Sequence, residues 1–381
     1  MKVLLVSNYL PDDQASMLAF KDVLARELPR QGCEVRVVMP ARKVLRVPPS
    51  SRLWKWLGYI DKFVLFAPSL RKHARWADVV HICDHSNGMY VPSVLAKPNV
   101  ITCHDVIAFQ ASLGMVPGWH VGRSGKIFQK LIFDGLKRAD LIACVSDLTR
   151  RDLLSLELTD ERKTITVLNG LNADFAPVPE PQAADLIGHF GLGLQDRYLI
   201  HVGSDLPRKN RMVVLQTFIA LAQRAAASGT PPLVDKLVLV GPPLSAPMAA
   251  LAREQGVGDK VLSLQKVSHE ELRALYARAV ALLFPSLQEG FGWPTIEAQA
   301  CGCAVFTSNL SPMNEIGGEG AVYIDPNDPL QIAAAIEQAA PRLANMRRLG
   351  LENASHYTAE QMTASYIAAY RRVMAERQAS A

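Results

Sequence analysis

The sequence predicts an α/β protein made of two doubly wound domains, each built on a parallel sheet. Short apolar segments alternate with amphipathic helical segments along almost the whole chain. This alternation is typical of strands that helices cover on both faces. A proline-rich stretch at residues 176–182 interrupts the alternation, which then begins again. With 381 residues, the chain has the length expected of two domains.

The proline-rich stretch is the predicted boundary between the domains. Pro177, Pro179 and Pro181 favour an extended connector. We therefore expect an N-terminal domain over residues 1–178, a linker over 179–194 and a C-terminal domain over 195–357. The last residues, 358–381, are expected to form a long amphipathic helix.

Apolar runs bounded by turn residues place the strands. In the N-terminal domain they are residues 2–7, 34–39, 79–82, 99–103, 141–145 and 164–168. In the C-terminal domain they are residues 198–202, 236–240, 261–264, 279–284, 303–307 and 321–324. Helices between them are expected at 17–30, 126–138, 148–155, 211–226, 270–278, 294–300 and 329–339.

The composition indicates a folded protein of a reducing compartment. Apolar residues make up 49% of the chain and charged residues 20%, which is enough to bury two cores. No apolar run is long enough for a transmembrane helix, and the N-terminus lacks a secretory cleavage signature. The cysteines lie mostly in or beside apolar strands, as small core residues do. We expect a cytoplasmic protein, and no metal site at the closely spaced Cys301 and Cys303.

The positive charge of the chain is concentrated in one segment. The formal net charge is +5, yet residues 41–76 hold nine Lys or Arg and one acid, Asp61. Tryptophan and phenylalanine alternate with these cations, which suits a helix lying on the anionic inner face of the cytoplasmic membrane through residues 42–75. The alternative is a helix that packs Trp54, Leu57 and Ile60 inward and leaves its cations in water. No basic stripe continues elsewhere, so we expect no nucleic-acid partner.

One turn, within residues 279–308, has the features of a ligand site. An apolar strand ends at Pro285, a loop with two glycines and Glu289 follows, and Pro294 is well placed to begin a helix. Glu297 lies eight residues after Glu289. Open α/β sheets bind phosphorylated ligands at such strand ends, where helix N-termini present free N–H groups.

The residues from Gly203 to Pro326 resemble the retaining glycosyltransferases of family GT4, which have two Rossmann-like domains facing across a cleft (the GT-B fold). The similar stretches, in the family's order, are HVGSDLPRKN, LVLVGPP, VSHEELRALYARAVALLFPSLQEGFGWPTIEAQACGCAVFTSN, NEIGGEGAVYIDP and HYTAEQMTASYIAAYRRV. The N-terminal half matches more weakly, through TCHD, ACVSD and VLNGLN. The resemblance implies a C-terminal helix that crosses back to the N-terminal domain. It also implies sugar transfer from a nucleotide diphosphate sugar without a metal or other cofactor.

The resemblance assigns the donor side of the site. Arg208 and Lys209 match cations that neutralise the diphosphate leaving group. Many members have an arginine at the position of Ser204, and Arg208 beside Lys209 is expected to supply the positive charge that is missing there. Glu289 matches the glutamate that lies against the donor sugar, and Glu297 the one that binds the ribose. We expect front-face attack, in which the acceptor hydroxyl gives its proton to the departing phosphate. The alternative is that Glu289 acts as a covalent nucleophile. The other expected donor-binding residues are Gly203, Ser204, Lys266, Val267, Gly290, Phe291, Gly292 and Trp293.

The acceptor side is assigned less directly. His104 matches a family position near the reacting sugar; the alternative is a histidine satisfied within its own domain at a strand end. The loop after the first strand lacks the family's glycine pair, so side chains restrict approach there. We expect Asp12, Asp13 and Asp105 to contact acceptor hydroxyls instead.

The expected function is transfer of a hexose, with GDP-mannose as the favoured donor, to a saccharide or lipid-linked saccharide in bacterial surface polysaccharide synthesis. A UDP-sugar is the alternative donor. A nucleotide-sugar epimerase of the same fold and a non-catalytic nucleotide-sugar binder are the alternative classes. An epimerase would act on the donor without an acceptor, which separates it from a transferase.

Overall fold

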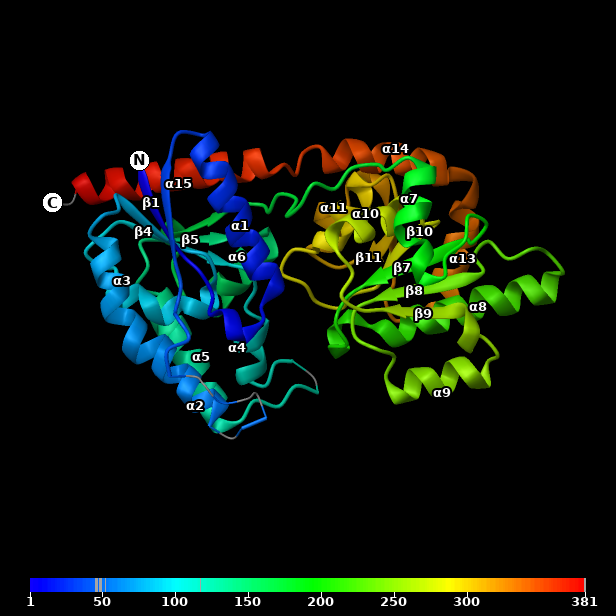
Figure 1. Cartoon of the computed structure of the whole chain (residues 1–381), viewed down its shortest axis with the longest axis horizontal. Helices are drawn as coiled ribbons and strands as arrows, with labels where there is room; N and C mark the ends of the chain where they lie inside the picture. The colour runs from blue at the N-terminus through cyan, green and yellow to red at the C-terminus, as the bar shows by residue number, and fades with distance from the viewer. Residues whose placement is uncertain (45–46, 48–49, 52, 117, 380–381) are drawn as a thin grey trace. The chain divides into compact units, whose positions relative to one another are not determined.

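A computed structural model describes residues 1–44, 47, 50–51, 53–116 and 118–379 (Figure 1). The chain divides into two compact units. Unit 1 consists of Met1–Asn172 together with Ala359–Ala381, and unit 2 is Ala173–Thr358. Each unit is described by itself below.

Unit 1 is a doubly wound parallel sheet. Its strands run in the order β2-β1-β3-β4-β5-β6, and every neighbouring pair is parallel. The order reverses between β1 and β3, so the carboxyl ends of these two strands form the switch point of the sheet. The strands are β1 (Lys2–Val6), β2 (Glu34–Val38), β3 (Val79–Ile82), β4 (Asn99–Cys103), β5 (Leu141–Cys144) and β6 (Thr164–Thr166).

Helices connect these strands because parallel pairing requires a crossover. They are α1 (Ala15–Arg30), α2 (Trp54–Tyr59), α3 (Phe66–Ala74), α4 (Ile107–Ser112), α5 (Arg123–Leu136) and α6 (Asp147–Ser155), and a π-helix, η2 (Ile60–Leu65), joins α2 to α3. A 3-10 segment, η3 (His85–Ser93), packs closely against α5. Gly88 and Gly135 make this approach possible, since a Cβ on Gly135 would lie 2.1 Å from the Gly88 carbonyl oxygen.

The C-terminal helix α15 (Ala359–Ala379) belongs to unit 1, as the sequence predicted. Its Tyr366 and Tyr370 are fully buried. Tyr370 Oη lies 2.7 Å from His81 Nδ1, while Thr102 Oγ1 lies 2.8 Å from both His81 Nε2 and Tyr366 Oη. This buried network of polar side chains ties the end of the chain to β3 and β4.

Unit 2 repeats the architecture with strand order β12-β11-β10-β7-β8-β9, again fully parallel. The strands are β7 (Tyr198–Val202), β8 (Lys236–Val240), β9 (Val261–Leu264), β10 (Ala281–Phe284), β11 (Ala304–Ser308) and β12 (Ala321–Ile324). The helices are α7 (Glu180–Ile187), α8 (Arg211–Ser228), α9 (Ala246–Glu254), α10 (His269–Arg278), α11 (Trp293–Ala300), α12 (Met313–Ile316), α13 (Pro329–Ala339) and α14 (Leu343–Ala354).

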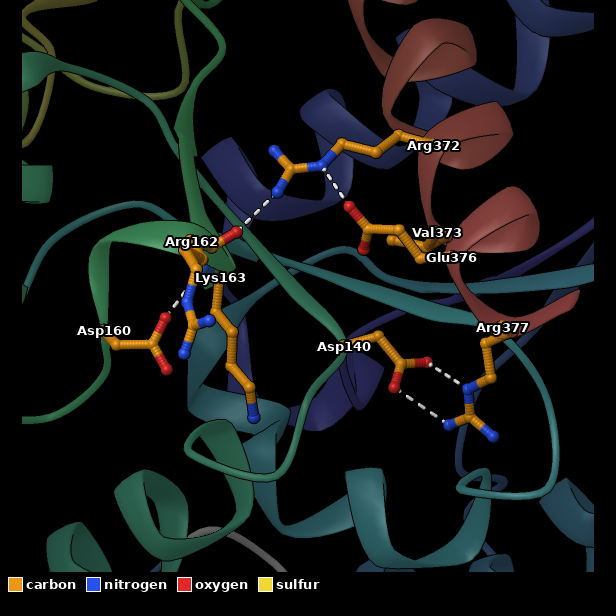
Figure 2. Close-up of a pocket in the computed structure, with 8 residues that line it drawn as sticks. All are labelled: Asp140, Asp160, Arg162, Lys163, Arg372, Val373, Glu376 and Arg377. Carbon is orange, nitrogen blue, oxygen red and sulfur yellow. Dashed lines mark hydrogen bonds and ion pairs between the residues drawn. The ribbon is translucent and has the colours of Figure 1, made fainter. Parts of the chain in front are cut away.

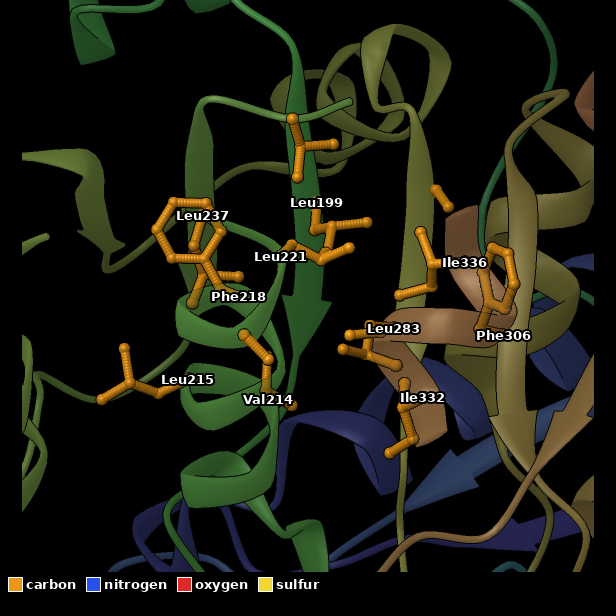
Figure 3. Close-up of a cluster of buried hydrophobic side chains, with 14 of the residues drawn as sticks. Leu199, Val214, Leu215, Phe218, Leu221, Leu237, Leu283, Phe306, Ile332 and Ile336 are labelled. Carbon is orange, nitrogen blue, oxygen red and sulfur yellow. The ribbon is translucent and has the colours of Figure 1, made fainter. Parts of the chain in front are cut away.

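The core of unit 2 shows why its strands are apolar throughout. Leu199 of β7, Leu283 of β10 and Phe306 of β11 are buried against Val214 and Phe218 of α8 and against α13 (Figure 3). The covering helices leave no solvent-facing side to these central strands, so alternation with polar residues is absent. The predicted fold class of two Rossmann-like α/β units is confirmed.

The structure differs from the sequence-based expectation in two places. The predicted linker over residues 179–194 contains α7 and lies in unit 2. A helix can form there because Pro181 occupies its first turn, where proline is tolerated. In the basic segment, Ile60 is exposed rather than packed inward, and Asp61 is buried. Arg46 and Arg52 lie outside the described residues. Among the helices described, none has the length and apolar character needed to cross a bilayer.

Candidate active site

The predicted donor-site cations and Glu289 meet at the switch point of the unit 2 sheet. Strand order reverses between β7 and β10, which are adjacent and parallel. Arg208 and Lys209 follow β7 in a short 3-10 turn, Pro207–Lys209, and Glu289 follows β10. Crevices at such carboxyl ends are the usual ligand sites of open α/β sheets.

Glu289 holds both cations in one hydrogen-bonded cluster. Arg208 Nη1 donates to Glu289 Oε2 at 2.8 Å, and Lys209 Nζ donates to Glu289 Oε1 at 2.6 Å. Arg208 Nη1 also donates to the Gln288 carbonyl oxygen at 2.8 Å. Ser286, which the sequence analysis did not identify, hydrogen-bonds Glu289 Oε1. The cluster carries two positive charges and one negative charge, so it is prepared to accept an anion.

Asn210 fixes the turn that carries the cations. Its backbone is left-handed, with φ of 56°, which asparagine tolerates better than most residues. Its side-chain amide donates to the carbonyl oxygens of Pro285 at 3.1 Å and Pro326 at 2.6 Å. It therefore links the loop after β7 to the ends of β10 and β12. The sequence contains the Pro-Arg-Lys-Asn motif, but only the fold reveals this clamp.

A buried histidine lies beneath Lys209. His201 of β7 is fully buried, and its Nδ1 lies 3.0 Å from the Leu283 carbonyl oxygen, to which it donates. Within the described part of the chain, His201 Nε2 has no hydrogen-bond partner. A Cβ on Gly203 would lie 3.1 Å from this nitrogen and 3.5 Å from the Lys209 stem. Gly203 therefore lets the imidazole and the lysine stem pack together.

Electrostatics keep the cluster ionised and the histidine neutral. Burial alone would raise the pKa of the Glu289 carboxyl, but Lys209 and Arg208 outweigh burial and hold it below its usual range. Burial lowers the pKa of His201 to about 4, and the nearby positive charge of Lys209 acts in the same direction. The Lys209 ammonium also lies 5.2 Å from the centre of the Phe284 ring, a favourable cation–π distance.

The loop after Glu289 leads into the buried helix α11. Gly292, with φ of 100°, precedes the first helical residue Trp293, one residue earlier than predicted. Glu297 in α11 is buried, and Tyr276 of α10 donates to its Oε2 at 3.2 Å. The structure thus places Glu289 with the two cations and Glu297 with Tyr276. Gly290 and Phe291 lie between them in the loop.

The remaining donor-side residues lie at other carboxyl ends of the same sheet. Gly203 and Ser204 follow β7, and Gly241 follows β8. Only glycine fits at position 241, because its φ is 144° and a Cβ there would lie 2.2 Å from the Gly203 carbonyl oxygen. Lys266 and Val267 follow β9, and Lys266 has a left-handed backbone with φ of 54°. An exposed lysine in this conformation is uncommon, and such backbones concentrate at functional sites.

His104 is buried at the carboxyl end of β4 in unit 1. Its Nε2 donates to the Cys83 carbonyl oxygen at 2.9 Å, and its ring packs edge-on against Phe20 at 4.8 Å. Burial lowers the pKa of His104, so the imidazole is neutral at physiological pH. These contacts hold the ring at the end of β4, and the role predicted for His104 near the reacting sugar stays a prediction.

A polar cluster at the β1/β3 switch point of unit 1 was missed from the sequence. Buried Asn8 donates to the carboxylate of Asp84, and His85 Nδ1 lies 3.2 Å from Asp84 Oδ1. Burial would raise the pKa of Asp84, but His85 and hydrogen bonds from Ser86 lower it overall. The sequence signal that could have identified this cluster is that Asn8 and Asp84 follow the apolar strands β1 and β3 closely.

Two of the three predicted acceptor-side acids, Asp12 and Asp105, have hydrogen-bond partners within unit 1. Asp12 accepts from Lys62 Nζ at 2.8 Å. Asp13 ends the 3-10 turn Leu10–Asp12 and has a left-handed backbone. Asp105 Oδ1 accepts from the Ile107 backbone N–H at 3.0 Å and so stabilises the start of α4. These contacts account for Asp12 and Asp105 structurally, and the acceptor-side role of all three acids stays a prediction.

A pocket in unit 1 lies away from these sites. Its volume is about 430 Å³, and its lining includes Asp140, Arg162, Lys163, Arg372 and Arg377 (Figure 2). Asp140 precedes β5 and Lys163 precedes β6, so the pocket lies at the amino ends of these strands. Arg377 donates to both carboxylate oxygens of Asp140, at 3.1 and 2.9 Å. The pocket therefore marks where α15 is anchored.

Comparison with known proteins identifies similar glycosyltransferases and similar folds. The O-antigen chain mannosyltransferase B of Escherichia coli is 28% identical over 294 residues, covering 75% of this chain and 73% of the relative. The O-antigen chain mannosyltransferase RfbU of Salmonella typhimurium is 26% identical, covering 64% of this chain and 61% of the relative. The solved sucrose-phosphate synthase of Thermosynechococcus elongatus shares the fold, with a TM-score of 0.71, 19% identity and 99% and 100% coverage.

Two protein-family profiles match consecutive parts of the chain. The profile described as Glycosyltransferase Family 4 matches residues 22–175, and the one described as Glycosyl transferases group 1 matches residues 187–348. The second match contains the whole cluster of Arg208, Lys209 and Glu289. The fold and the site define a glycosyltransferase with two Rossmann-like units. The chain belongs to glycosyltransferase family 4, and the resemblance found in the sequence is confirmed.

Proposed function

We propose that this glycosyltransferase transfers mannose from GDP-mannose, with retention of anomeric configuration, to a saccharide or lipid-linked saccharide acceptor. The proposal places this reaction in bacterial surface polysaccharide synthesis. The names of the two O-antigen mannosyltransferases support the sugar and the acceptor class. The observation that carries the proposal is the cluster in which Glu289 holds Arg208 and Lys209 at a sheet switch point.

This cluster suits a diphosphate leaving group. As the bond between the anomeric carbon and the phosphate oxygen breaks, negative charge grows on that oxygen. Arg208 uses Nη1 for Glu289 and the Gln288 carbonyl oxygen, so its other N–H groups can donate to phosphate. Lys209 Nζ has two further protons available for the same purpose. Donors already in position stabilise developing charge without reorganising.

In the proposed step, the acceptor hydroxyl attacks the anomeric carbon from the face that the phosphate leaves. The new bond joins the acceptor oxygen to the anomeric carbon, and the hydroxyl proton passes to the departing β-phosphate oxygen. Glu289 orients the cations and faces the donor sugar hydroxyls. Glu297, held by Tyr276, is assigned to the ribose, and the loop Gly290–Trp293 to the phosphates.

The remaining roles extend the proposal to the whole chain. His104 acts near the reacting sugar, and Asp12, Asp13 and Asp105 serve the acceptor side. The two cations stand in for a metal, so the reaction proceeds in the presence of EDTA. We place the enzyme on the cytoplasmic side of the membrane, with peripheral contact through residues 42–75.

A donor panel tests this proposal directly. Purified protein is mixed with GDP-, UDP-, ADP- and dTDP-sugars, and thermal unfolding is recorded. A ligand at 100 times its Kd adds about 2.7 kcal/mol of stability, which is readily detected. We expect the largest shift with GDP-mannose and little shift in an Arg208→Ala/Lys209→Ala variant. A larger shift with a UDP-sugar would replace the donor, and an equal shift in the variant would refute the site.

Product analysis tests the reaction class. NMR of the transferred sugar should show the same anomeric configuration as the donor. Incubation with donor and no acceptor should leave the sugar unchanged. Conversion of the donor to its epimer under these conditions would contradict the transferase assignment.

A further inference from the structure

Two helical segments that are far apart in sequence lie side by side in unit 1. Tyr59, at the end of α2, stacks on Phe128 of α5 with ring centres 5.7 Å apart. Phe63 of η2 lies 5.7 Å from the same Phe128 ring. These three rings form a seam between the α2–η2 segment and α5. The α2–η2 segment and α5 are therefore neighbours on the surface of unit 1.

Large apolar side chains next to this seam are exposed. On the α2–η2 side, Trp56 is 65% exposed and Val64 is 62% exposed. On α5, Ile127 is 63% exposed and Leu131 is 55% exposed. Ile127 and Leu131 are four residues apart and so share one helix face. Exposed apolar side chains therefore flank the seam on both of its sides, and apolar surface gathered in this way is typical of an interaction surface.

An apolar groove runs along the seam. Its volume is about 420 Å³, and it is lined mainly by Phe63 of η2, Ala67 of α3, and Phe128 and Leu131 of α5. Asp134 and Arg138 also line it. Met89 and Pro92 of η3 close its floor. Leu131 thus belongs both to the exposed face of α5 and to the groove, which connects the two features.

Cations surround these apolar residues. Residues 123–138 hold five Lys or Arg and one acid, and all five cations are exposed. In α5 each exposed apolar residue directly follows an exposed lysine: Lys126 precedes Ile127, and Lys130 precedes Leu131. Arg71 and Lys72 of α3, and Arg75 directly after it, are also exposed. Lysine stems can lie along hydrocarbon while their ammonium groups reach anionic headgroups.

We propose that η2 and α5 together form a docking surface for a bilayer containing anionic lipids. The docking surface comprises Trp56, Ile60, Val64, Ile127 and Leu131 with Lys126 and Lys130. Its apolar side chains enter the headgroup boundary, the cations bind anionic lipid, and the groove receives hydrocarbon from one lipid chain. The surface extends beyond residues 42–75 to a second helix. It does not depend on the donor or acceptor of the enzyme.

Two other occupants fit the observations less well. A second copy of this chain meeting the same surface would bring the cations of both copies together, which is unfavourable for a symmetric contact. Nucleic acid would use the cations but would leave Trp56, Ile127 and Leu131 without apolar partners. A bilayer satisfies both the charge and the exposed hydrocarbon.

Vesicle co-sedimentation of the full chain tests the docking surface. Vesicles of phosphatidylcholine alone are compared with vesicles containing 30% phosphatidylglycerol, a fraction chosen at about the level that gives a strongly anionic surface. We expect binding only to the anionic vesicles. Lys126→Gln/Lys130→Gln should weaken partitioning about 30-fold, because each cation near an anionic surface contributes about fivefold. Ile127→Ser/Leu131→Ser should weaken it at least as much.

Matched variants in unit 2 control for loss of charge or apolar surface in general. Arg253→Gln/Lys260→Gln and Leu194→Ser/Leu330→Ser change exposed residues of the same kinds and should leave partitioning unchanged. All altered residues are exposed, and circular dichroism verifies that each variant is folded.

Three results would overturn the proposal. The first is equal binding to neutral and anionic vesicles, or no binding to either. The second is a dimer in light scattering that Ile127→Ser/Leu131→Ser converts to monomer without any vesicle binding. The third is retention of an RNA or DNA oligomer in preference to vesicles.

Discussion

Replacing Glu289 separates the two roles that the structure gives to this carboxylate. Among the described residues, Glu289 is the acid that pairs with both Arg208 and Lys209, so Glu289→Ala leaves two neighbouring cations uncompensated. Breaking a buried ion pair by removing one partner costs about 3–5 kcal/mol. Because the Arg208 and Lys209 side chains are 23% and 14% exposed, solvent reduces this cost, and we expect about 2–3 kcal/mol.

The stability that Glu289→Ala loses should depend on whether a nucleotide is bound. For a unit of this size it corresponds to a fall in Tm of about 4–12 °C without nucleotide. A nucleoside diphosphate supplies the missing negative charge, so it should stabilise the variant more than it stabilises the unaltered protein. Sugar transfer should nevertheless be abolished, because the donor sugar loses its carboxylate partner and the cations lose their orientation.

Calorimetry with and without GDP, together with a transfer assay, measures these effects. Glu337→Ala is the matched control, since Glu337 pairs with Arg224 in the same unit but both side chains are substantially exposed. This control should lose less than about 1 kcal/mol. Unchanged transfer by Glu289→Ala, or a complete loss of nucleotide binding, would refute the reasoning.

Three further variants test the supporting contacts. Asn210→Gly keeps the left-handed backbone but removes two hydrogen bonds, so the donor KM should rise in steady-state kinetics and about 1–3 kcal/mol of stability should be lost. Asn210→Ala should lose about 1 kcal/mol more, because alanine is strained in this backbone conformation. Equal stability of the two variants would contradict the strain argument. His201 has a folded pKa of about 4 against 6.5 unfolded, so protonation favours the unfolded chain as pH falls from 6.5 to 4, at a cost of about 3 kcal/mol. Urea unfolding of His201→Phe across this range should show a smaller loss of stability on acidification, and an unchanged pH slope would argue against a neutral buried imidazole. Tyr370→Phe leaves His81 Nδ1 without its partner and should cost about 1–3 kcal/mol in urea unfolding, whereas Tyr357→Phe is expected to cost less.

The strands could be predicted from the sequence because parallel strands covered on both faces are continuous apolar runs. Residues 79–82 and 281–284 are buried at every position, and their apolar pattern cannot be confused with an amphipathic helix. Helix α7 was missed because proline at the start of a helix and proline in a linker have the same sequence appearance.

The candidate site was predictable in its residues but not in its contacts. The family motif identified Arg208, Lys209 and Glu289, while the ion pairs among them depend on β7 and β10 being neighbours, which local pattern does not determine. Ser286 and His201 lie within the stretches that resemble the family, but nothing in the sequence marks them as neighbours of the cluster. Only the part of the docking surface within residues 42–75 could be predicted from the sequence, because α5 is brought beside this segment only by the fold.

The central claim is that Arg208 and Lys209 bind the diphosphate of the donor. Isothermal titration with a nucleoside diphosphate and the matching monophosphate, GDP and GMP if the panel selects guanosine, measures this most directly. We predict that the unaltered protein prefers the diphosphate at least tenfold, since each charge-assisted contact contributes about 1.5–3 kcal/mol. The preference should disappear in Arg208→Ala/Lys209→Ala while the monophosphate still binds. An unchanged preference in this variant would contradict the claim.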